Sequence, residues 1–207
     1  MIEALLFDLG KVLVDFDFEL GMRQFAAKTP LSREDFERVI WDKHWIRRYE
    51  RGEISTGEYH DHLCERGKLG MSLGEFEEAW SSVFLPEPIL PERLLTNLKR
   101  RYPLILVSNT NEVHAAFVAK QYSVFEHFGH RILSHEVGSL KPDRGIYEAA
   151  IHASGKAPEA LFFTDDREEN IEAALHLGIR AHLFRSPSGL VQALGEHGVE
   201  VGELQEI

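Results

Sequence analysis

The stretch ALLFDLGKVLVD, residues 4–15, decides the predicted fold of this chain. It begins with an apolar run of strand length, which ends at the carboxylate Asp8. Gly10, a turn residue, follows two positions later. An apolar run bounded by turn residues is typical of a buried strand in a parallel sheet. In open α/β sheets the functional residues lie just beyond the carboxyl ends of the strands. Asp8 therefore stands where a functional carboxylate is expected, although this stretch alone fits a simple turn cap equally well.

The sequence changes character after a tight connection that we expect over residues 10–17. Apolar residues then recur at helical spacing up to about residue 88. Ser55 and Ser72, each followed three residues later by a glutamate, mark helix starts. The pattern predicts about four helices and no strand in this segment, and Pro86 and Pro88 mark its end.

The remainder of the chain alternates between strand and helix patterns. Alternation of this kind predicts right-handed crossovers and a mainly parallel sheet. We expect an α/β fold with a Rossmann-like parallel sheet core, residues 1–16 and 89–207, and an α-helical cap subdomain, residues 17–88, inserted into it. The expected strands are 104–107, 131–133, 160–164 and 181–184, and the expected helices are 91–101, 112–121, 143–153, 168–177 and 188–195.

The composition is that of an ordinary water-soluble domain, with 43% hydrophobic and 28% charged residues among 207. The net charge of −11 argues against a nucleic-acid partner, since phosphate backbones require a basic patch. A single cysteine, Cys64, excludes an intrachain disulfide and suits a reducing cytoplasm. We expect no membrane span, because no apolar run approaches the roughly 18 residues that one needs. The oligomeric state, monomer or dimer, stays open.

Polar residues follow the predicted strands at the positions where parallel strands share one edge. These are Asp8, the pair Ser108-Asn109, and Asp165-Asp166, together with Lys141 in a loop before a helix. Carboxylates from two strands can share a Mg²⁺ ion, and a lysine adds positive charge for a phosphoryl group. An aspartate can itself attack phosphorus, forming an aspartyl-phosphate. The combination predicts phosphoryl-transfer chemistry.

The same motifs resemble those of the haloacid dehalogenase superfamily, and the likeness covers essentially the whole chain. It is nearest to the branch that contains an α-D-glucose-1-phosphate phosphatase. The matching segments are FDLGKV (7–12), VSNTN (107–111), Lys141-Pro142, FTDD (163–166) with Asn170, and the cap segment ERGEIS (50–55).

The resemblance implies a role for each matched residue. It makes Asp8 the nucleophile and a Mg²⁺ ligand, with the backbone carbonyl of Gly10 and the carboxylate of Asp166 as further ligands. Asp165 and Asn170 would support that coordination. Ser108 and the amide of Asn109 would bind the phosphoryl group, and Lys141 would link it to Asp8.

One position departs from the family pattern. Most phosphatases of the superfamily carry an aspartate two residues after the nucleophile as general acid and base, and this chain has Gly10 there. Three alternatives follow: a slow enzyme, another acid supplied by the cap, or esters whose leaving group needs little protonation. Because an anomeric hydroxyl is unusually acidic, the third alternative favours sugar-1-phosphates.

The segment 41–49 mixes aromatic and cationic side chains on one predicted helix. Trp41, Trp45 and Tyr49 recur every four residues and share a face, which fits an apolar seam inside the cap. The alternative is contact with substrate, and we name His44 and Trp45 as candidate substrate-binding residues. Aromatic faces suit sugar rings.

The expected function is a Mg²⁺-dependent phosphatase acting on a small phosphorylated metabolite, with a sugar-1-phosphate as the candidate substrate, through an aspartyl-phosphate on Asp8. Two alternatives compete with it. A metal-independent haloacid dehalogenase would have the same fold but would not need the paired carboxylates Asp165 and Asp166. A non-catalytic binding protein would explain the missing acid, yet not the retention of Asp8 and Lys141.

Overall fold

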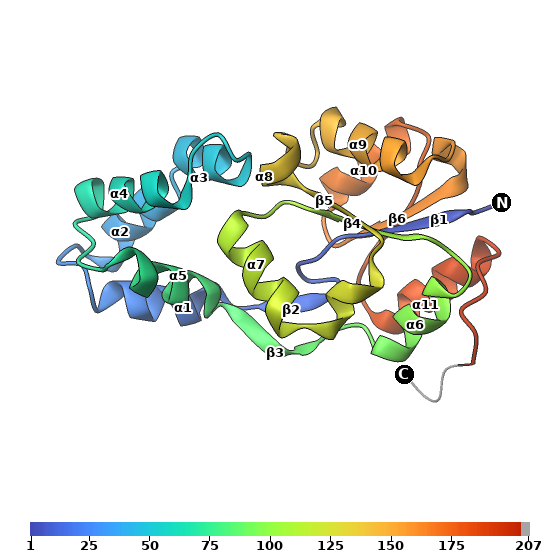
Figure 1. Cartoon of the computed structure of the whole chain (residues 1–207), viewed down its shortest axis with the longest axis horizontal. Helices are drawn as coiled ribbons and strands as arrows, with labels where there is room; N and C mark the ends of the chain where they lie inside the picture. The colour runs from blue at the N-terminus through green and yellow to red at the C-terminus, as the bar shows by residue number, and fades with distance from the viewer. Residues whose placement is uncertain (204–207) are drawn as a thin grey trace.

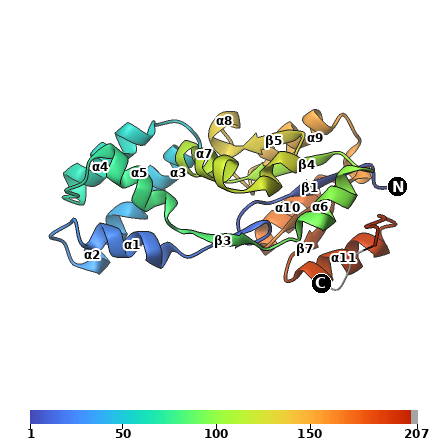
Figure 2. The ribbon, with the colours of Figure 1, turned by 60° about the horizontal axis from the view of Figure 1, so that its bottom comes forward.

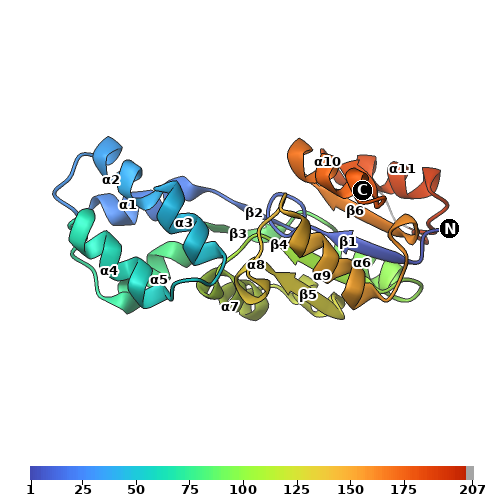
Figure 3. The same cartoon turned by 90° about the horizontal axis from the view of Figure 1, so that it is seen from above.

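A computed structural model describes residues 1–203 of the chain. Helices gather at one end of the molecule and a parallel sheet covered by further helices forms the other end (Figure 1). The same separation is seen from above in Figure 3. The strands are β1 (Ala4–Phe7), β2 (Val14–Phe16), β3 (Phe84–Pro88), β4 (Leu104–Ser108), β5 (His130–Leu133), β6 (Leu161–Asp165) and β7 (Arg180–Leu183).

The helices between β2 and β3 are α1 (Phe18–Ala26), α2 (Arg33–Ile40), α3 (Lys43–Glu50), α4 (Thr56–Arg66) and α5 (Leu73–Ser81). Those that follow are α6 (Glu92–Lys99), α7 (Glu112–Gln121), α8 (Ser134–Val137), α9 (Arg144–Ser154), α10 (Glu168–His176) and α11 (Pro187–Glu196), with short 3-10 turns at Ser123–His127 and Pro158–Ala160.

The central sheet confirms the predicted α/β class. Within residues 1–203 it contains five strands in the order β5-β4-β1-β6-β7, and each neighbouring pair is parallel. β1 is therefore the middle strand, with β4 on one side and β6 on the other. This position explains why its four residues are all buried.

The two faces of β1 serve two different hydrophobic clusters, because successive side chains of a strand point to opposite sides. Leu5 and Phe7 pack with residues of α6, α7 and α11. Ala4 and Leu6 pack with residues of α9 and α10. The sheet is thus covered on both faces, as a parallel sheet requires.

The sequence prediction missed a strand in the segment before residue 89. It expected no strand there, but β3 pairs antiparallel with β2, with Phe16 opposite Phe84. Proline is tolerated in such a ribbon because an edge strand leaves some N–H positions unpaired. Pro86 and Pro88, which were expected to mark the end of the helical segment, therefore lie inside β3, which runs between the helical end and the sheet (Figure 2).

The helical segment has a hydrophobic cluster of its own. Five helices, rather than the expected four, enclose fully buried aromatic residues such as Phe36, Tyr59 and Phe76. Capping boxes at Ser55 and Ser72 start α4 and α5 as the sequence predicts. This separate cluster supports the division into a core, 1–16 and 89–207, and a cap, 17–88, which stays a prediction.

No helix within the described residues is both long enough and apolar enough to cross a membrane.

Candidate active site

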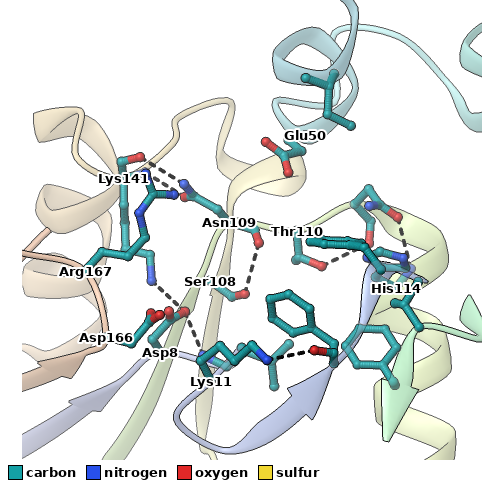
Figure 4. A pocket seen from close by; sticks show the side chains of 18 of the residues that line it. Asp8, Lys11, Glu50, Ser108, Asn109, Thr110, His114, Lys141, Asp166 and Arg167 are labelled. Carbon is teal, nitrogen blue, oxygen red and sulfur yellow. Dashed lines mark hydrogen bonds and ion pairs between the residues drawn. The ribbon is translucent and has the colours of Figure 1, made fainter. Parts of the chain in front are cut away.

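The carboxyl ends of the three central strands bring the candidate residues together. Asp8 follows β1, Ser108 ends β4 and Asp165 ends β6. Because β4 and β6 both pair with β1, these ends are neighbours along one edge of the sheet. The loop between α8 and α9 adds Lys141, whose side chain reaches the same edge (Figure 4).

Lys141 is the cation at the centre of the site. Its side chain is only 1% exposed, and its Nζ lies 2.6 Å from Oδ1 of Asp8 and 2.7 Å from Oδ2 of Asp165. It also donates a hydrogen bond to the carbonyl of Val107 at 2.8 Å. A buried ammonium group with this arrangement binds two strand ends together through charge and hydrogen bonding.

The ionisation of the site reflects its burial. Burial raises the pKa of Asp8 to about 7, against the attraction of Lys141 and with a further contribution from the charge of Asp165. The pKa of Asp166 is also raised, mainly by burial and secondly by the negative charge of the neighbouring Asp165. Burial opposes the charged form of Lys141, but the two carboxylates hold the pKa of its ammonium group above the ordinary value. The carboxylates together carry more negative charge than Lys141 neutralises.

The residues present fit a divalent metal ion. Asp8, Asp165 and Asp166 each offer an oxygen, and the three oxygens lie within 4.8 Å of one another. Among the described residues, Oδ1 of Asn170 is buried without a hydrogen-bond partner, although Asn170 lines the cavity beside them. A cluster of hard oxygen donors with excess negative charge is typical of a Mg²⁺ site.

Asp165 has a different environment from the other two carboxylates. Its Oδ1 accepts hydrogen bonds from the backbone N–H of Arg167 and from Nδ2 of Asn170, both at 2.9 Å, while Oδ2 faces Lys141. Asp8 and Asp166 line the cavity, and Asp165 is fully buried behind them. The geometry thus suits Asp165 to holding Lys141 and Asn170 in place.

Asn109 connects the end of β4 to the Lys141 loop. Its Nδ2 donates to the carbonyl of Lys141 at 2.9 Å, and its Oδ1 accepts from the backbone N–H of Lys141 at 2.6 Å. These reciprocal bonds position the lysine backbone. Ser108, which is buried, also lines the cavity between Asn109 and Asp8 (Figure 4).

A cavity of about 330 Å³ opens above the acidic edge. This volume is in the range of small-molecule binding sites. Its floor is formed by the residues described above, and its walls come from the cap and from the β2–β3 ribbon. The wall residues include Phe16, Phe18, Trp41, Ile46, Glu50, Trp80, Val83 and Phe84.

The structure does not bring His44 and Trp45 to this cavity. The Trp45 ring stacks on His62 inside the cap, with ring centroids 4.0 Å apart, and His44 is exposed. Trp41 does line the cavity, and Tyr49 is buried in the cap cluster. The prediction of a single helix over residues 41–49 was wrong at its start, because α2 ends at Ile40 with Trp41 as its C-cap and α3 begins after Asp42. Trp41 therefore leaves the face that Trp45 and Tyr49 share.

Sequence reasoning did not single out several residues that line the cavity. Lys11, Thr110, Asn111, His114 and Arg167 all contribute to it. Glu50 does so as well, and the only signal for it was its place in the cap segment that resembles the family. Lys11, Thr110 and Asn111 lie in the other matched segments, but the resemblance gave them no role. His114 and Arg167 carry no local pattern that separates them from ordinary surface or core residues.

The structure explains why position 10 carries no acid. A Cβ atom at Gly10 would lie 2.7 Å from Cε1 of Phe16, closer than such atoms approach in real structures. The Phe16 ring is itself held by Phe18 and Phe84, with ring centroids 4.9 and 6.4 Å away. The ring therefore occupies the space in which a side chain at position 10 would lie.

We expect Gly10→Asp to lower the free energy of unfolding by about 1–3 kcal/mol, because Phe16 must move out of its packing, and to give no gain in activity. Urea denaturation checks the stability. The matched comparison is the same substitution in a Phe16→Ala background, where its cost should shrink. An equal cost in both backgrounds would show that Phe16 is not the obstacle.

The fold and the site define a hydrolase with an aspartate at the end of its central strand. The model of the haloacid dehalogenase-like hydrolase family matches residues 2–178. The chain belongs to this family of enzymes.

Individual relatives agree with this assignment. A D-ribitol-5-phosphate phosphatase of Bacteroides thetaiotaomicron is 25% identical over 185 residues, which cover 86% of this chain and 89% of that protein. A haloacid dehalogenase family enzyme of the same organism, solved in complex with magnesium and inorganic phosphate, superposes with a TM-score of 0.75 at 29% identity and covers 90% of this chain and 96% of that one. A hydrolase of this type from Porphyromonas gingivalis gives 0.80 at 26% identity, over 97% and 99% of the two chains.

Proposed function

We propose that this chain is a Mg²⁺-dependent phosphatase that hydrolyses a small phosphorylated sugar or polyol through an aspartyl-phosphate on Asp8. The observation that carries the proposal is the acidic cluster of Asp8, Asp165 and Asp166 with Lys141 bound to it. Two relatives support the same conclusion: one is a D-ribitol-5-phosphate phosphatase, and the other is a family enzyme whose structure contains magnesium and inorganic phosphate.

The residues of the chain divide the work as follows. Asp8 attacks phosphorus, and Lys141 holds the attacking carboxylate in place and offers positive charge to the phosphoryl oxygens. Asp8, Asp166 and the carbonyl of Gly10 would hold Mg²⁺, with Asn170 beside them. When bound, Mg²⁺ neutralises charge on the phosphoryl group. Ser108 and the amide of Asn109 are the proposed donors to the remaining phosphoryl oxygens.

The choice of substrate depends on the cavity walls. His44 and Trp45 stay candidates from the sequence alone, since neither lines the cavity. Trp41, which does line it, is the aromatic residue better placed to cover a sugar ring. Sugar-1-phosphates remain the substrates favoured by Gly10, while the relative's name points to a primary phosphate ester. A cytoplasmic location, expected from the single unpaired Cys64, also remains a prediction.

The proposal is tested by phosphate release from a panel that contains glucose-1-phosphate, glucose-6-phosphate and D-ribitol-5-phosphate. We expect release with Mg²⁺ and its loss with EDTA, because the acidic cluster then lacks its counter-charge. Restoration by added Mg²⁺ is the control. Activity that survives the chelator would favour a metal-independent dehalogenase, and faster turnover of the primary esters would contradict the preference for anomeric phosphates.

A further inference from the structure

Glu50 is an ionisable residue of the cap that faces the cavity and has no assigned role. It ends α3, and its carboxylate points from the cap toward the strand edge that carries Asp8 and Ser108 (Figure 4). In the part of the chain that the structure describes, this carboxylate has no hydrogen bond or ion pair, although the residue is half-buried. Partial removal from water without a hydrogen-bond partner disfavours the charged form of such a carboxylate.

The backbone around Glu50 is fastened to the core, so the carboxylate is held at a defined position. The connections are a hydrogen bond from Tyr49 Oη to Asn111 Oδ1 at 3.2 Å, one from Ser134 Oγ to the Glu50 carbonyl at 2.6 Å, and an ion pair between Arg51 and Asp143 at 2.7 Å. Residues before, at and after Glu50 are therefore all joined to the core.

Gly52 shows how closely this part of the cap approaches the core. Its φ is +67°, and a Cβ atom there would lie 2.1 Å from the carbonyl oxygen of His135. Only glycine fits both the backbone conformation and the contact. The docking is therefore built into the backbone, and rigid elements of this kind are what a catalytic side chain needs for precise placement.

We propose that Glu50 is the general acid and base of the hydrolysis, in the role that Gly10 leaves empty. This inference rests on the proposed phosphatase function and deepens it. Burial raises the pKa of Glu50 to about 7, against the attraction of Arg47 and Arg167, so its carboxyl group can both give and take a proton near neutral pH.

The other ionisable residues of the cavity are committed elsewhere. Lys11 pairs with a neighbouring carboxylate and donates to a backbone carbonyl. Burial lowers the pKa of His114 to about 4, so its ring is neutral and carries one N–H. That N–H, on Nε2, donates to the backbone carbonyl of Trp80 at 2.8 Å. Arg167 does not release a proton, and Asp166 belongs to the acidic cluster. Glu50 is what remains.

The proposed sequence of steps balances in protons and charge. An Asp8 carboxylate oxygen forms a bond to phosphorus while the ester P–O bond breaks, and the leaving oxygen receives the proton of the Glu50 carboxyl group. The alcohol departs. The Glu50 carboxylate then takes a proton from water as the water oxygen attacks phosphorus, which releases inorganic phosphate, restores Asp8 and leaves Glu50 protonated.

The test uses esters whose leaving groups differ in their need for a proton: p-nitrophenyl, phenyl and benzyl phosphate. With Mg²⁺ present, Glu50→Gln should lower kcat/KM for benzyl phosphate by about 10²- to 10⁴-fold, because benzyl alcohol leaves only when protonated. The loss for p-nitrophenyl phosphate should stay below about tenfold, since p-nitrophenolate leaves unaided. The same variant should release p-nitrophenolate in a burst, because water attack on the aspartyl-phosphate lacks its base.

Glu53→Gln is the matched control. Glu53 lies close by in the same cap segment, is exposed and faces Arg48, so its substitution should leave all three esters unaffected. An equal loss for all three esters in Glu50→Gln, or no loss, would overturn the role of Glu50. Absence of turnover in the unmodified enzyme with Mg²⁺ would instead overturn the phosphatase itself and the inference with it.

Discussion

Asp8→Asn should lower phosphate release by at least about 10⁴-fold at saturating Mg²⁺, because an amide cannot form the covalent bond to phosphorus that the carboxylate forms. Asp8 is the first residue after the central strand, and its Oδ1 contacts both Lys141 and the backbone N–H of Leu9. No other carboxylate lining the cavity, among the described residues, has Lys141 within ion-pair distance. Acid quenching should trap a phosphorylated protein in the unmodified enzyme and none in the variant.

The fold should survive this change. Asparagine has nearly the shape of aspartate. Because its side chain is neutral, it also avoids the cost of burying a charge, the cost that raises the pKa of Asp8. Thermal unfolding checks this point. Asp61→Asn, on the exposed surface of α4, serves as the control and should keep full activity. If Asp8→Asn keeps more than about a tenth of the turnover, the nucleophile lies elsewhere and the aspartyl-phosphate route is wrong.

Lys141→Ala should lower the free energy of unfolding by about 3–5 kcal/mol, because it leaves Asp8 and Asp165 buried without their counter-charge. It should also lower kcat/KM by about 10²- to 10³-fold, since a preorganised donor to the phosphoryl group is lost. Urea denaturation and steady-state kinetics measure the two effects. Mg²⁺ should stabilise the variant by more than it stabilises the unmodified protein, because the metal then supplies the missing positive charge.

A second lysine provides the comparison. Lys156 pairs with Glu3 at 2.6 Å on the surface, where both side chains are well exposed. Lys156→Ala should therefore change the free energy of unfolding by no more than about 1 kcal/mol. A similarly small effect at Lys141 would mean that the buried carboxylates are protonated in the folded protein rather than compensated by the lysine.

Local patterns were sufficient for the core of the fold. The buried strands, the helices between them and the polar residues at the strand ends are all encoded within a few neighbouring positions, as Asp8 after β1 and Asp165 at the end of β6 show. Once the alternation of strands and helices predicts a parallel sheet, the ends of its strands must share one edge. The family resemblance added roles for those residues but no further geometry.

The tertiary structure alone decided what surrounds that edge. It paired β2 with β3, placed Phe16 in the space next to Gly10, turned Trp45 away from the cavity and brought Glu50 into it. Each outcome depends on how the cap packs against the sheet, through contacts such as that of Gly52 with His135. A helical or strand period records which face of one element is apolar. It holds no information about which residue of that element contacts another subdomain, because that contact depends on the shapes of the cap and of the core together.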